Sequence, residues 1–208
     1  MKKLLLLLFL IPLISCTEDW TGEKEVTYLQ DRNGIKYEVN SEVGFTGKYV
    51  EYYKNGQKKD ESNYKDGKVD GLWTRYYENG QKSYESDFRN SKQEGLQTGW
   101  HENGQKESES NYNNNKKEGL QTEWHENGQK SAEVNWKNGK KEGLLTEWHE
   151  NGQKSAEVNW KNGEIDGLLT EWDKEGNIGK PETIKGFDFF DKILESIEKN
   201  IEKNIEKN

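Results

Sequence analysis

The sequence predicts an all-β repeat array: an antiparallel β-hairpin meander, or solenoid, of 24-residue units, followed by a C-terminal amphipathic helix. The stretch at 119–142, GLQTEWHENGQKSAEVNWKNGKKE, recurs almost unchanged at 143–166. Apolar and polar residues alternate within each unit, which is typical of half-buried strands. Glycines recur every 24 residues, at Gly47, Gly71, Gly95, Gly119, Gly143 and Gly167. A fixed period of this kind indicates stacked repeats.

The composition fits a thin array better than a thick globular core. Only 29% of the residues are hydrophobic and 34% are charged, which approaches the profile of disordered chains. Eight Trp, ten Tyr and six Phe recur in register, however, and a repeat array needs each unit to pack only on its neighbours. The net charge of −8 disfavours nucleic acid, because binding phosphates requires an excess of Lys and Arg. The single cysteine, Cys16, excludes an internal disulfide.

The first residues indicate a leader. Lys2 and Lys3 precede an apolar run at 4–14, which is shorter than the roughly 20 residues of a membrane-spanning helix. A run of this length is typical of a signal peptide. The residues Leu13-Ile14-Ser15-Cys16 resemble a bacterial lipobox. The resemblance implies a signal peptide at 1–15 and a mature chain that begins at a lipid-modified Cys16.

The implied address is the bacterial cell envelope. Several acyl chains hold a protein firmly in a membrane, whereas one chain binds marginally. Thr17 follows the cysteine, and this resembles the pattern of outer-membrane lipoproteins if the cell is Gram-negative. The alternative is a plain secretory signal with an incidental cysteine.

The remaining chain divides into four parts. Residues 16–25 are polar and are predicted to be a tether. Residues 26–46 are predicted to form a capping hairpin, because Asn33-Gly34 separates two β-rich runs at 26–29 and 35–39. The repeat array is assigned to 47–178. Residues 179–208 are predicted to contain an amphipathic helix.

Each repeat is predicted to contain two strands, and we number its positions from the anchoring glycine as zero. In the repeat of Gly119, Leu120 and Trp124 mark the first strand and Val134 the second. A two-residue Asn-Gly turn would place Trp124 and Val134 on opposite faces, because a slip of one residue reverses every side chain. We therefore predict a three-residue loop at 126–128 with a glycine bulge, and a shared face for Trp124 and Val134. The second connection, at 137–139, is predicted to have the same form.

The anchoring glycines stand where one hairpin joins the next. We expect a side chain there to collide with the aromatic residue at position 5 or 17 of a neighbouring unit. A β-bulge is the alternative explanation.

The residues GLWTRYYENG at 71–80 and GKYVEYYKNG at 47–56 resemble the bacterial variant of the MORN repeat. The resemblance extends over about 44–178. It implies a β-hairpin array that serves binding or scaffolding and is not an enzyme. Some bacterial members are described as antitoxin-like, which implies an alternative role in neutralising a partner protein. From residue 95 onward this chain departs from the pattern, because His101, His125 and His149 replace the second aromatic residue.

The aromatic residues are the candidate ligand-binding surface, since rows of Trp and Tyr bind sugars or protein partners. The alternative is that they form the core. Lysines at position 11 share their predicted face and are expected to cover the rings with their aliphatic stems. The candidate residues are Trp73, Trp100, Trp124, Trp136, Trp148, Trp160 and Trp172.

No metal site, cofactor or catalytic centre is predicted. Histidines two strands apart lie roughly 10 Å from one another, too far to share one zinc ion. The sequence has no HExxH motif, no P-loop and no GxSxG elbow. Weak divalent-cation binding is an alternative for an acidic stripe, which is predicted on one polar face: Glu123, Glu133, Glu147, Glu157 and Glu171.

The C-terminal end combines a phenylalanine cluster with isoleucines at spacing i, i+4, which predicts an amphipathic helix. We expect it to cap the open last hairpin; a membrane-surface or partner helix is the alternative. Taken together, the sequence predicts a non-catalytic, lipid-anchored repeat protein that binds a protein or glycan at the cell envelope. The membrane partner is reached through the lipid on Cys16.

Overall fold

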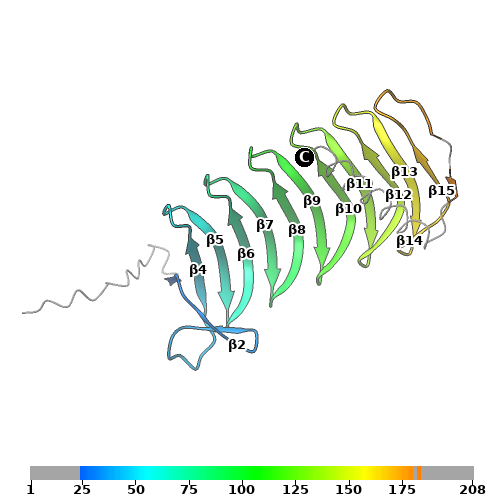
Figure 1. Ribbon diagram of the computed structural model, residues 1–208. Helices are drawn as coiled ribbons and strands as arrows, with labels where there is room; N and C mark the ends of the chain where they lie inside the picture. The colour runs from blue at the N-terminus through cyan, green and yellow to red at the C-terminus, as the bar shows by residue number, and fades with distance from the viewer. Residues whose placement is uncertain (1–23, 180–181, 184–208) are drawn as a thin grey trace, which may run out of the picture.

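The computed structural model describes residues 24–179 and 182–183. Over these residues the chain is all β, as predicted, and fourteen strands form a single sheet that follows the order of the chain (Figure 1). The signal peptide at 1–15, Cys16, most of the tether and nearly all of the predicted C-terminal helix lie outside the described residues.

The long strands alternate in direction and come in pairs, one pair to each 24-residue unit. They are β4 (Gly47–Tyr52), β5 (Lys58–Lys65), β6 (Lys68–Tyr76), β7 (Lys82–Arg89), β8 (Lys92–Trp100), β9 (Lys106–Asn113), β10 (Lys116–Trp124), β11 (Lys130–Lys137), β12 (Lys140–Trp148) and β13 (Lys154–Lys161). Three short strands complete the C-terminal edge: β14 (Glu164–Ile165), β15 (Leu168–Glu171) and β16 (Glu182–Thr183).

At the N-terminal end a small hairpin surrounds the Asn33-Gly34 turn. It consists of β2 (Gln30–Arg32) and β3 (Ile35–Tyr37), so its first strand begins later than the predicted 26–29. The preceding strand, β1 (Glu25–Val26), instead pairs in parallel with β4. Phe45, which is fully buried, joins the hairpin to the array through backbone hydrogen bonds to Lys36 and Gly67.

The loop within each repeat has the predicted three residues. In the repeat of Gly119, the backbone N–H of His125 donates to the carbonyl of Gln129, and that of Gly128 donates to the carbonyl of His125. Gly128 has φ of +81°, the left-handed conformation that glycine adopts without a steric penalty. Three residues, 126–128, therefore separate His125 and Gln129, the hydrogen-bonded pair that closes the hairpin.

The connection between repeats is shorter than predicted. Lys137 pairs directly with Lys140, so the loop holds only Asn138 and Gly139 rather than 137–139. Both residues have positive φ, which defines a type I′ turn and matches the twist of the flanking strands. The prediction of a three-residue connection is wrong because an asparagine also tolerates the left-handed region.

An extra residue in the second strand reverses the predicted faces. Glu123 pairs with Ala132, but Trp124 pairs with Lys130, so Ser131 is a β-bulge that has no partner. Val134 therefore lies opposite Gln121, and Trp124 lies on the other surface of the sheet. The prediction of a shared face for Trp124 and Val134 is wrong, because it counted the loop correctly and missed the bulge beyond it.

The sheet thus has two surfaces with different rows of side chains. The leucine face carries positions 1, 3, 5, 11 and 14 of each repeat, which are Leu120, Thr122, Trp124, Lys130 and Glu133 in the repeat of Gly119. The valine face carries positions 2, 4, 13, 15 and 17, which are Gln121, Glu123, Ala132, Val134 and Trp136 in the same repeat.

The anchoring glycines are explained by backbone conformation. Their φ values run from +74° at Gly95 to +146° at Gly47, and the strand register shifts beside them. A Cβ atom built on Gly95, Gly119 or Gly143 would meet nothing within 4 Å. The expected collision with a neighbouring aromatic side chain is therefore wrong, and the alternative of a bulge holds.

Candidate functional site

The leucine face exposes one apolar row from the repeat of Gly71 to that of Gly167, while the first repeat has Lys48 at the same position. Its leucines occupy position 1 of successive repeats and are 39% to 53% exposed: Leu72, Leu96, Leu120, Leu144 and Leu168. Neighbouring members are two strands apart, which places them roughly 10 Å from one another. Between this row and the aromatic row, position 3 holds a buried threonine such as Thr122. The leucines are therefore a regular exposed apolar row on this surface.

The tryptophans of the leucine face are covered by lysines from the preceding repeat. The Lys106 ammonium lies 5.7 Å from the ring centroid of Trp124, and the Lys130 ammonium lies 5.9 Å from that of Trp148. Lys82 and Lys154 occupy the same place over Trp100 and Trp172. The lysines and these tryptophans share a face as expected, but it is the ammonium group that lies over each ring, in cation–π geometry.

Each of these four lysines, and Lys58 at the same position of the first repeat, also forms an ion pair with a glutamate three residues later on the same strand. The pairs are Lys58–Glu61, Lys82–Glu85, Lys106–Glu109, Lys130–Glu133 and Lys154–Glu157. In a regular strand, residues three apart point to opposite faces. Here the intervening bulge brings them together, so a repeated Lys-x-x-Glu pattern is the sequence signal that could have revealed the bulge.

The valine face holds the buried apolar side chains of the C-terminal repeats. Val134, Leu145 and Val158 form a buried cluster, against which Trp136 and Trp160 pack. The Lys117 ammonium lies 4.8 Å from the Trp136 ring centroid. In the N-terminal repeats this face is aromatic, and Trp73 contacts Tyr84 and Phe88 at centroid distances of 6.0 and 5.5 Å.

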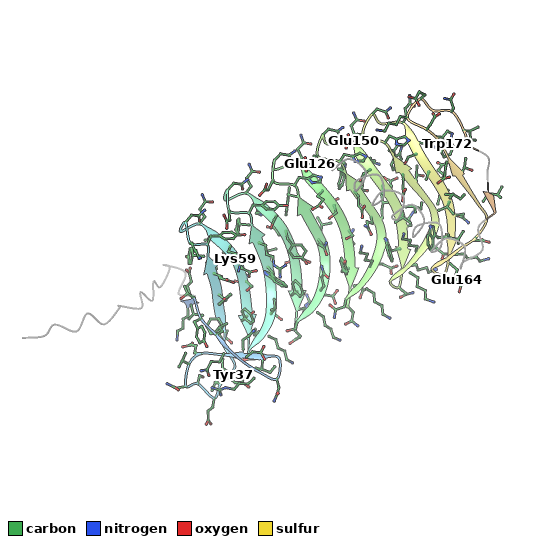
Figure 2. All side chains as sticks on the ribbon, in the orientation of Figure 1. Tyr37, Lys59, Glu126, Glu150, Glu164 and Trp172 are labelled. Carbon is green, nitrogen blue, oxygen red and sulfur yellow. The ribbon has the colours of Figure 1, made fainter. Side chains whose placement is uncertain are left out.

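The predicted aromatic candidates therefore do not form one surface. Trp100, Trp124, Trp148 and Trp172 lie on the leucine face, whereas Trp73, Trp136 and Trp160 lie on the valine face. Figure 2 shows the side chains projecting from both surfaces of the sheet. The prediction from sequence placed them on one surface because it did not include the bulge at Ser131 and the equivalent bulges in the other repeats.

The predicted acidic stripe is divided for the same reason. Glu123, Glu147 and Glu171 lie on the valine face, while Glu133 and Glu157 lie on the leucine face within the lysine ion pairs. Burial by surrounding side chains raises the pKa of Glu147. The charges of Glu123 and Glu171 add to this rise, and that of Lys141 opposes it.

The histidines join neighbouring repeats. The Nε2 atoms of His101, His125 and His149 lie 2.8, 2.8 and 2.9 Å from the backbone carbonyls of Trp124, Trp148 and Trp172. A carbonyl can only accept, so Nε2 carries the hydrogen. Tyr53 and Tyr77 make the equivalent bond with their hydroxyl groups in the N-terminal repeats. The half-buried histidines therefore serve the packing of hairpin tips.

Like the histidine bonds, a second ladder of hydrogen bonds joins each loop to the loop of the next repeat. The Asn127 side chain donates from Nδ2 to the carbonyl of Glu150 in the next repeat and accepts from the backbone N–H of Gln129. Asn55, Asn79, Asn103 and Asn151 do the same in their own repeats. Successive hairpin tips are thus held by two hydrogen bonds from each repeat to its successor.

Neither a metal centre nor a membrane-spanning helix is found in the described part of the chain. Residues 24–179 and 182–183 contain no group of three His, Cys, Asp or Glu side chains placed to hold a metal ion. Over the same residues, no helix has the length and apolar character needed to span a bilayer.

The architecture defines an all-β protein built from tandem hairpin repeats. The family model described as "MORN repeat variant" matches five segments, at 45–66, 69–90, 93–114, 117–138 and 141–162. Because these segments make up more than half of the chain, the protein belongs to the MORN repeat variant family. Repeats of this kind indicate a binding or scaffolding module.

The other comparisons add little. No curated protein sequence matches the chain. Among solved structures, a chain from the "Crystal structure of GtfA/B complex bound to UDP and GlcNAc" aligns at 14% identity with a TM-score of 0.21. The alignment covers 67% of this chain and 25% of that chain.

Proposed function

We propose that this protein is a non-catalytic binding module that holds a protein partner on its leucine face at the cell envelope. The observation that carries the proposal is the exposed row of leucines, which occupies the same position in five successive repeats. Single exposed apolar residues are common, but here they recur at one position of five successive units in a straight row, and aligned apolar side chains of this kind mark interaction surfaces.

The magnitude of leucine burial indicates that a partner must contact several repeats. Covering the exposed half of one leucine contributes about 1 kcal/mol, since full burial contributes about 1.5–3 kcal/mol. Association costs at least about 4 kcal/mol in lost translational and rotational freedom. A partner that contacted a single leucine would not stay bound, whereas one that spans the array could.

Protein is favoured over glycan by the state of the aromatic rings. Sugars bind by stacking on an open ring face. On the leucine face a lysine ammonium already lies over each of the four tryptophans, at 5.7 to 5.9 Å from the ring centroid. A glycan would have to displace these lysines, which are also held by the glutamate ion pairs.

The proposed location at the cell envelope depends on the N-terminal residues 1–16. Lys2-Lys3, the apolar run at 4–14 and the Ser15-Cys16 junction together support a lipid anchor at the membrane. The antitoxin-like alternative stays a prediction, and no described residue favours it. The anchor predicts incorporation of radiolabelled palmitate into the wild-type protein and none into Cys16→Ala; an unlabelled wild-type protein would overturn the address.

The partner is tested by photo-crosslinking in intact envelopes. A photoreactive residue at position 120 or 144 should capture one protein, and Leu120→Glu with Leu144→Glu should abolish its capture from a probe at position 96. The matched control is the same probe at Ala132, on the valine face. Equal capture from both faces, or capture that survives the two glutamates, would overturn the proposed surface.

A separate experiment tests purified envelope glycan as the ligand. Binding of glycan with a change in tryptophan fluorescence, in the absence of any protein crosslink at 120 or 144, would replace the protein partner with a glycan.

A further inference from the structure

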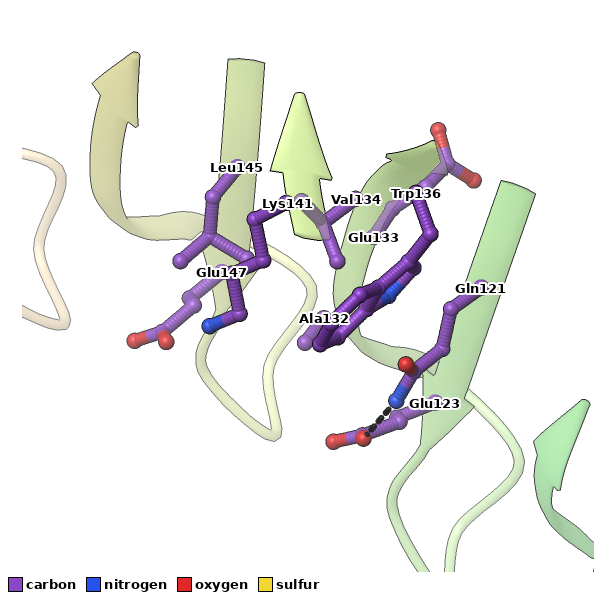
Figure 3. A pocket seen from close by; sticks show the side chains of 9 residues that line it. All are labelled: Gln121, Glu123, Ala132, Glu133, Val134, Trp136, Lys141, Leu145 and Glu147. Carbon is purple, nitrogen blue, oxygen red and sulfur yellow. Dashed lines mark hydrogen bonds between the residues drawn. The ribbon is translucent and has the colours of Figure 1, made fainter. Parts of the chain in front are cut away.

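The hollow beside Trp136 on the valine face is too small for a drug-sized ligand. Its volume is about 90 Å³, and its walls include Val134, Leu145 and Glu147 (Figure 3). Pockets that bind such ligands have about 300 Å³ or more. The reactive groups of this chain lie instead in its turns, because the dipeptide Asn-Gly occurs eight times in the sequence.

An asparagine that precedes a glycine reacts with its own backbone. The glycine nitrogen attacks the side-chain carbonyl carbon, Cγ, and ammonia leaves together with the proton of the glycine N–H. The resulting cyclic succinimide then takes up water. Opening at one carbonyl gives aspartate, and opening at the other gives isoaspartate, in which the main chain runs through the β-carbon. Nothing is oxidised or reduced, and glycine favours the attack because it has no Cβ beside the nitrogen.

Five of these asparagines lie in the three-residue loops, and their side chains are held at both ends. Asn127 donates from Nδ2 to the carbonyl of Glu150 at 2.7 Å and accepts from the N–H of Gln129 at 3.0 Å. Departure of Nδ2 as ammonia therefore breaks a bond to the next repeat. The same two bonds hold Asn55, Asn79, Asn103 and Asn151.

The Asn-Gly turns that connect repeats leave the asparagine side chain unrestrained. They are Asn138-Gly139 and Asn162-Gly163, and both residues of each turn have positive φ. Both asparagines are exposed, and neither carboxamide makes a hydrogen bond to residues 24–179 or 182–183. The remaining pair, Asn33-Gly34, closes the small β2–β3 hairpin, where the Asp31 carboxylate binds the N–H of the glycine.

The glycine nitrogen does not distinguish the two classes of turn. The N–H of Gly139 donates to the carbonyl of Lys117 at 2.9 Å, and the N–H of Gly128 in the loop donates to that of His125 at 2.8 Å. Any difference in reactivity between Asn127 and Asn138 therefore comes from the side chain.

Two further connections have the same backbone but a larger second residue. The φ values are +51° and +61° at Asn90-Ser91 and +53° and +65° at Asn114-Asn115, against +53° and +78° at Asn138-Gly139. A side chain on the second residue crowds the nitrogen that attacks. The array therefore contains its own controls, in which the turn is retained and only the following residue differs.

We propose that Asn138 and Asn162 are sites of spontaneous deamidation, which converts these two connections to aspartate or isoaspartate while the loop asparagines persist. Water is the only co-reactant. Aspartate fits the turn, because Asp66 has φ of +51° in the equivalent place of the first repeat. Isoaspartate does not fit, because an additional main-chain atom in a two-residue turn disturbs the pairing of Lys137 with Lys140.

The aspartate product also acquires an unfavourable neighbour. Glu118 accepts from the backbone N–H of Asn138 at 2.7 Å, whereas the hydroxyl of Thr46 accepts from that of Asp66 at 2.9 Å. A carboxylate at position 138 therefore lies beside the carboxylate of Glu118, and like charges repel. Deamidation weakens the junction between the repeats of Gly119 and Gly143.

Peptide mass spectrometry tests the proposal on the full-length chain, kept folded at mildly alkaline pH and digested in acid with pepsin. Conversion of amide to carboxylate at positions 138 and 162 should be at least about tenfold faster than at 127 and 151. This factor is equivalent to about 1.4 kcal/mol, roughly the contribution of two hydrogen bonds. Positions 90 and 114 should also react more slowly than 138. In urea, positions 127, 138, 151 and 162 should react at similar rates.

Gly139→Ser is the matched variant, because Ser91 already occupies this place in an earlier turn. It should slow conversion at Asn138 and leave Asn162 in the same chain unchanged. If the variant unfolds, Asn127 will react as fast as Asn162, and the wild-type comparison with positions 90 and 114 decides alone. Equal rates at Asn127 and Asn138 in the folded wild type, or undiminished conversion in a folded Gly139→Ser variant, would overturn the proposal.

The effect on the junction is measured separately. Asn138→Asp should lower the urea midpoint, and the additional change Glu118→Thr, which reproduces the first repeat, should restore it. An Asn138→Asp midpoint equal to that of wild type would overturn the weakening. None of these results depends on capture at Leu120 and Leu144, so this proposal and the proposed function fail separately.

Discussion

The N-terminal and C-terminal repeats share one backbone and differ in what covers their valine face. Both halves use the three-residue loop, the two-residue type I′ turn and the strand bulge. The first repeats pack ring against ring, as in Tyr49–Tyr64 and Trp73–Phe88. The later repeats pack valine and leucine. The difference teaches that turns and bulges specify this fold, while the contents of one face can vary with what must be covered.

The largest expected difference concerns Trp73 and Val158. Trp73→Ala removes contacts with Tyr84 and Phe88 and the indole hydrogen bond to Asp60, so it should destabilise the protein by about 3 kcal/mol. Val158→Ala removes two methyl groups and should cost about 1.5 kcal/mol. Urea unfolding measures both values, with Leu120→Ala as an exposed control. Equal losses would show that the aromatic half is no better packed than the aliphatic half.

Glycine substitutions compare two positions that have the same backbone conformation. Gly119→Ala and Gly128→Ala should each cost about 1 to 2 kcal/mol, because alanine is strained at positive φ. Gly128→Ala should cost slightly more, since the flexible end of the Gln105 side chain in the preceding repeat would have to move away from the new Cβ.

The matched control for this pair is the double variant Gly128→Ala with Gln105→Ala. It should recover the excess loss and leave the backbone strain, as measured by the urea midpoint. A Gly119→Ala variant less stable than Gly128→Ala would contradict the explanation by contact.

The hydrogen bonds at the hairpin tips are made by tyrosine in the N-terminal repeats and by histidine in the C-terminal repeats, so the two halves can be compared at one position. His125→Ala removes the bond to the Trp148 carbonyl and should cost about 1 kcal/mol. His125→Tyr should be close to neutral, because Tyr77 makes the same bond to Trp100 in an earlier repeat. Thermal unfolding distinguishes the two variants. If tyrosine is as damaging as alanine, the ladder positions are not interchangeable.

The smallest expected effect is opposite pH dependence at two glutamates. Burial acts to raise the pKa of Glu61, but hydrogen bonds and charges from Lys58 and Lys48 outweigh it and lower the pKa. Its stabilising contribution is therefore present above the ordinary glutamate pKa and is lost as the pH falls through the lowered value.

Glu147 behaves in the opposite sense. Burial raises its pKa, so its contribution is present below the ordinary pKa and is lost as the pH rises through the raised value. The side chain is also partly open to solvent, which screens the interaction, so the effect on stability is small. Urea unfolding of Glu61→Gln and Glu147→Gln between acid and neutral pH should give slopes that deviate from wild type in opposite directions. Deviations of the same sign would contradict the assignment.

The sequence predicted the architecture because the repeat period, the loop at 126–128 and the strand alternation are all local signals. It misplaced the faces because one bulge at Ser131 reverses every later side chain, and the hydropathy pattern does not mark a bulge. The Lys130–Glu133 spacing was the available signal. The exposed leucine row was missed for the same reason, since Leu120 was grouped with residues expected to share a face with Val134.

The loop ladders run in one direction, because His125 and Asn127 always donate to the following repeat. Every internal unit therefore presents acceptors to its predecessor and donors to its successor, in the same places. A further 24-residue copy inserted between two units would find both sets of bonds ready. Evolution can thus set the reach of the molecule by duplication, in increments of roughly 10 Å, without altering any existing junction.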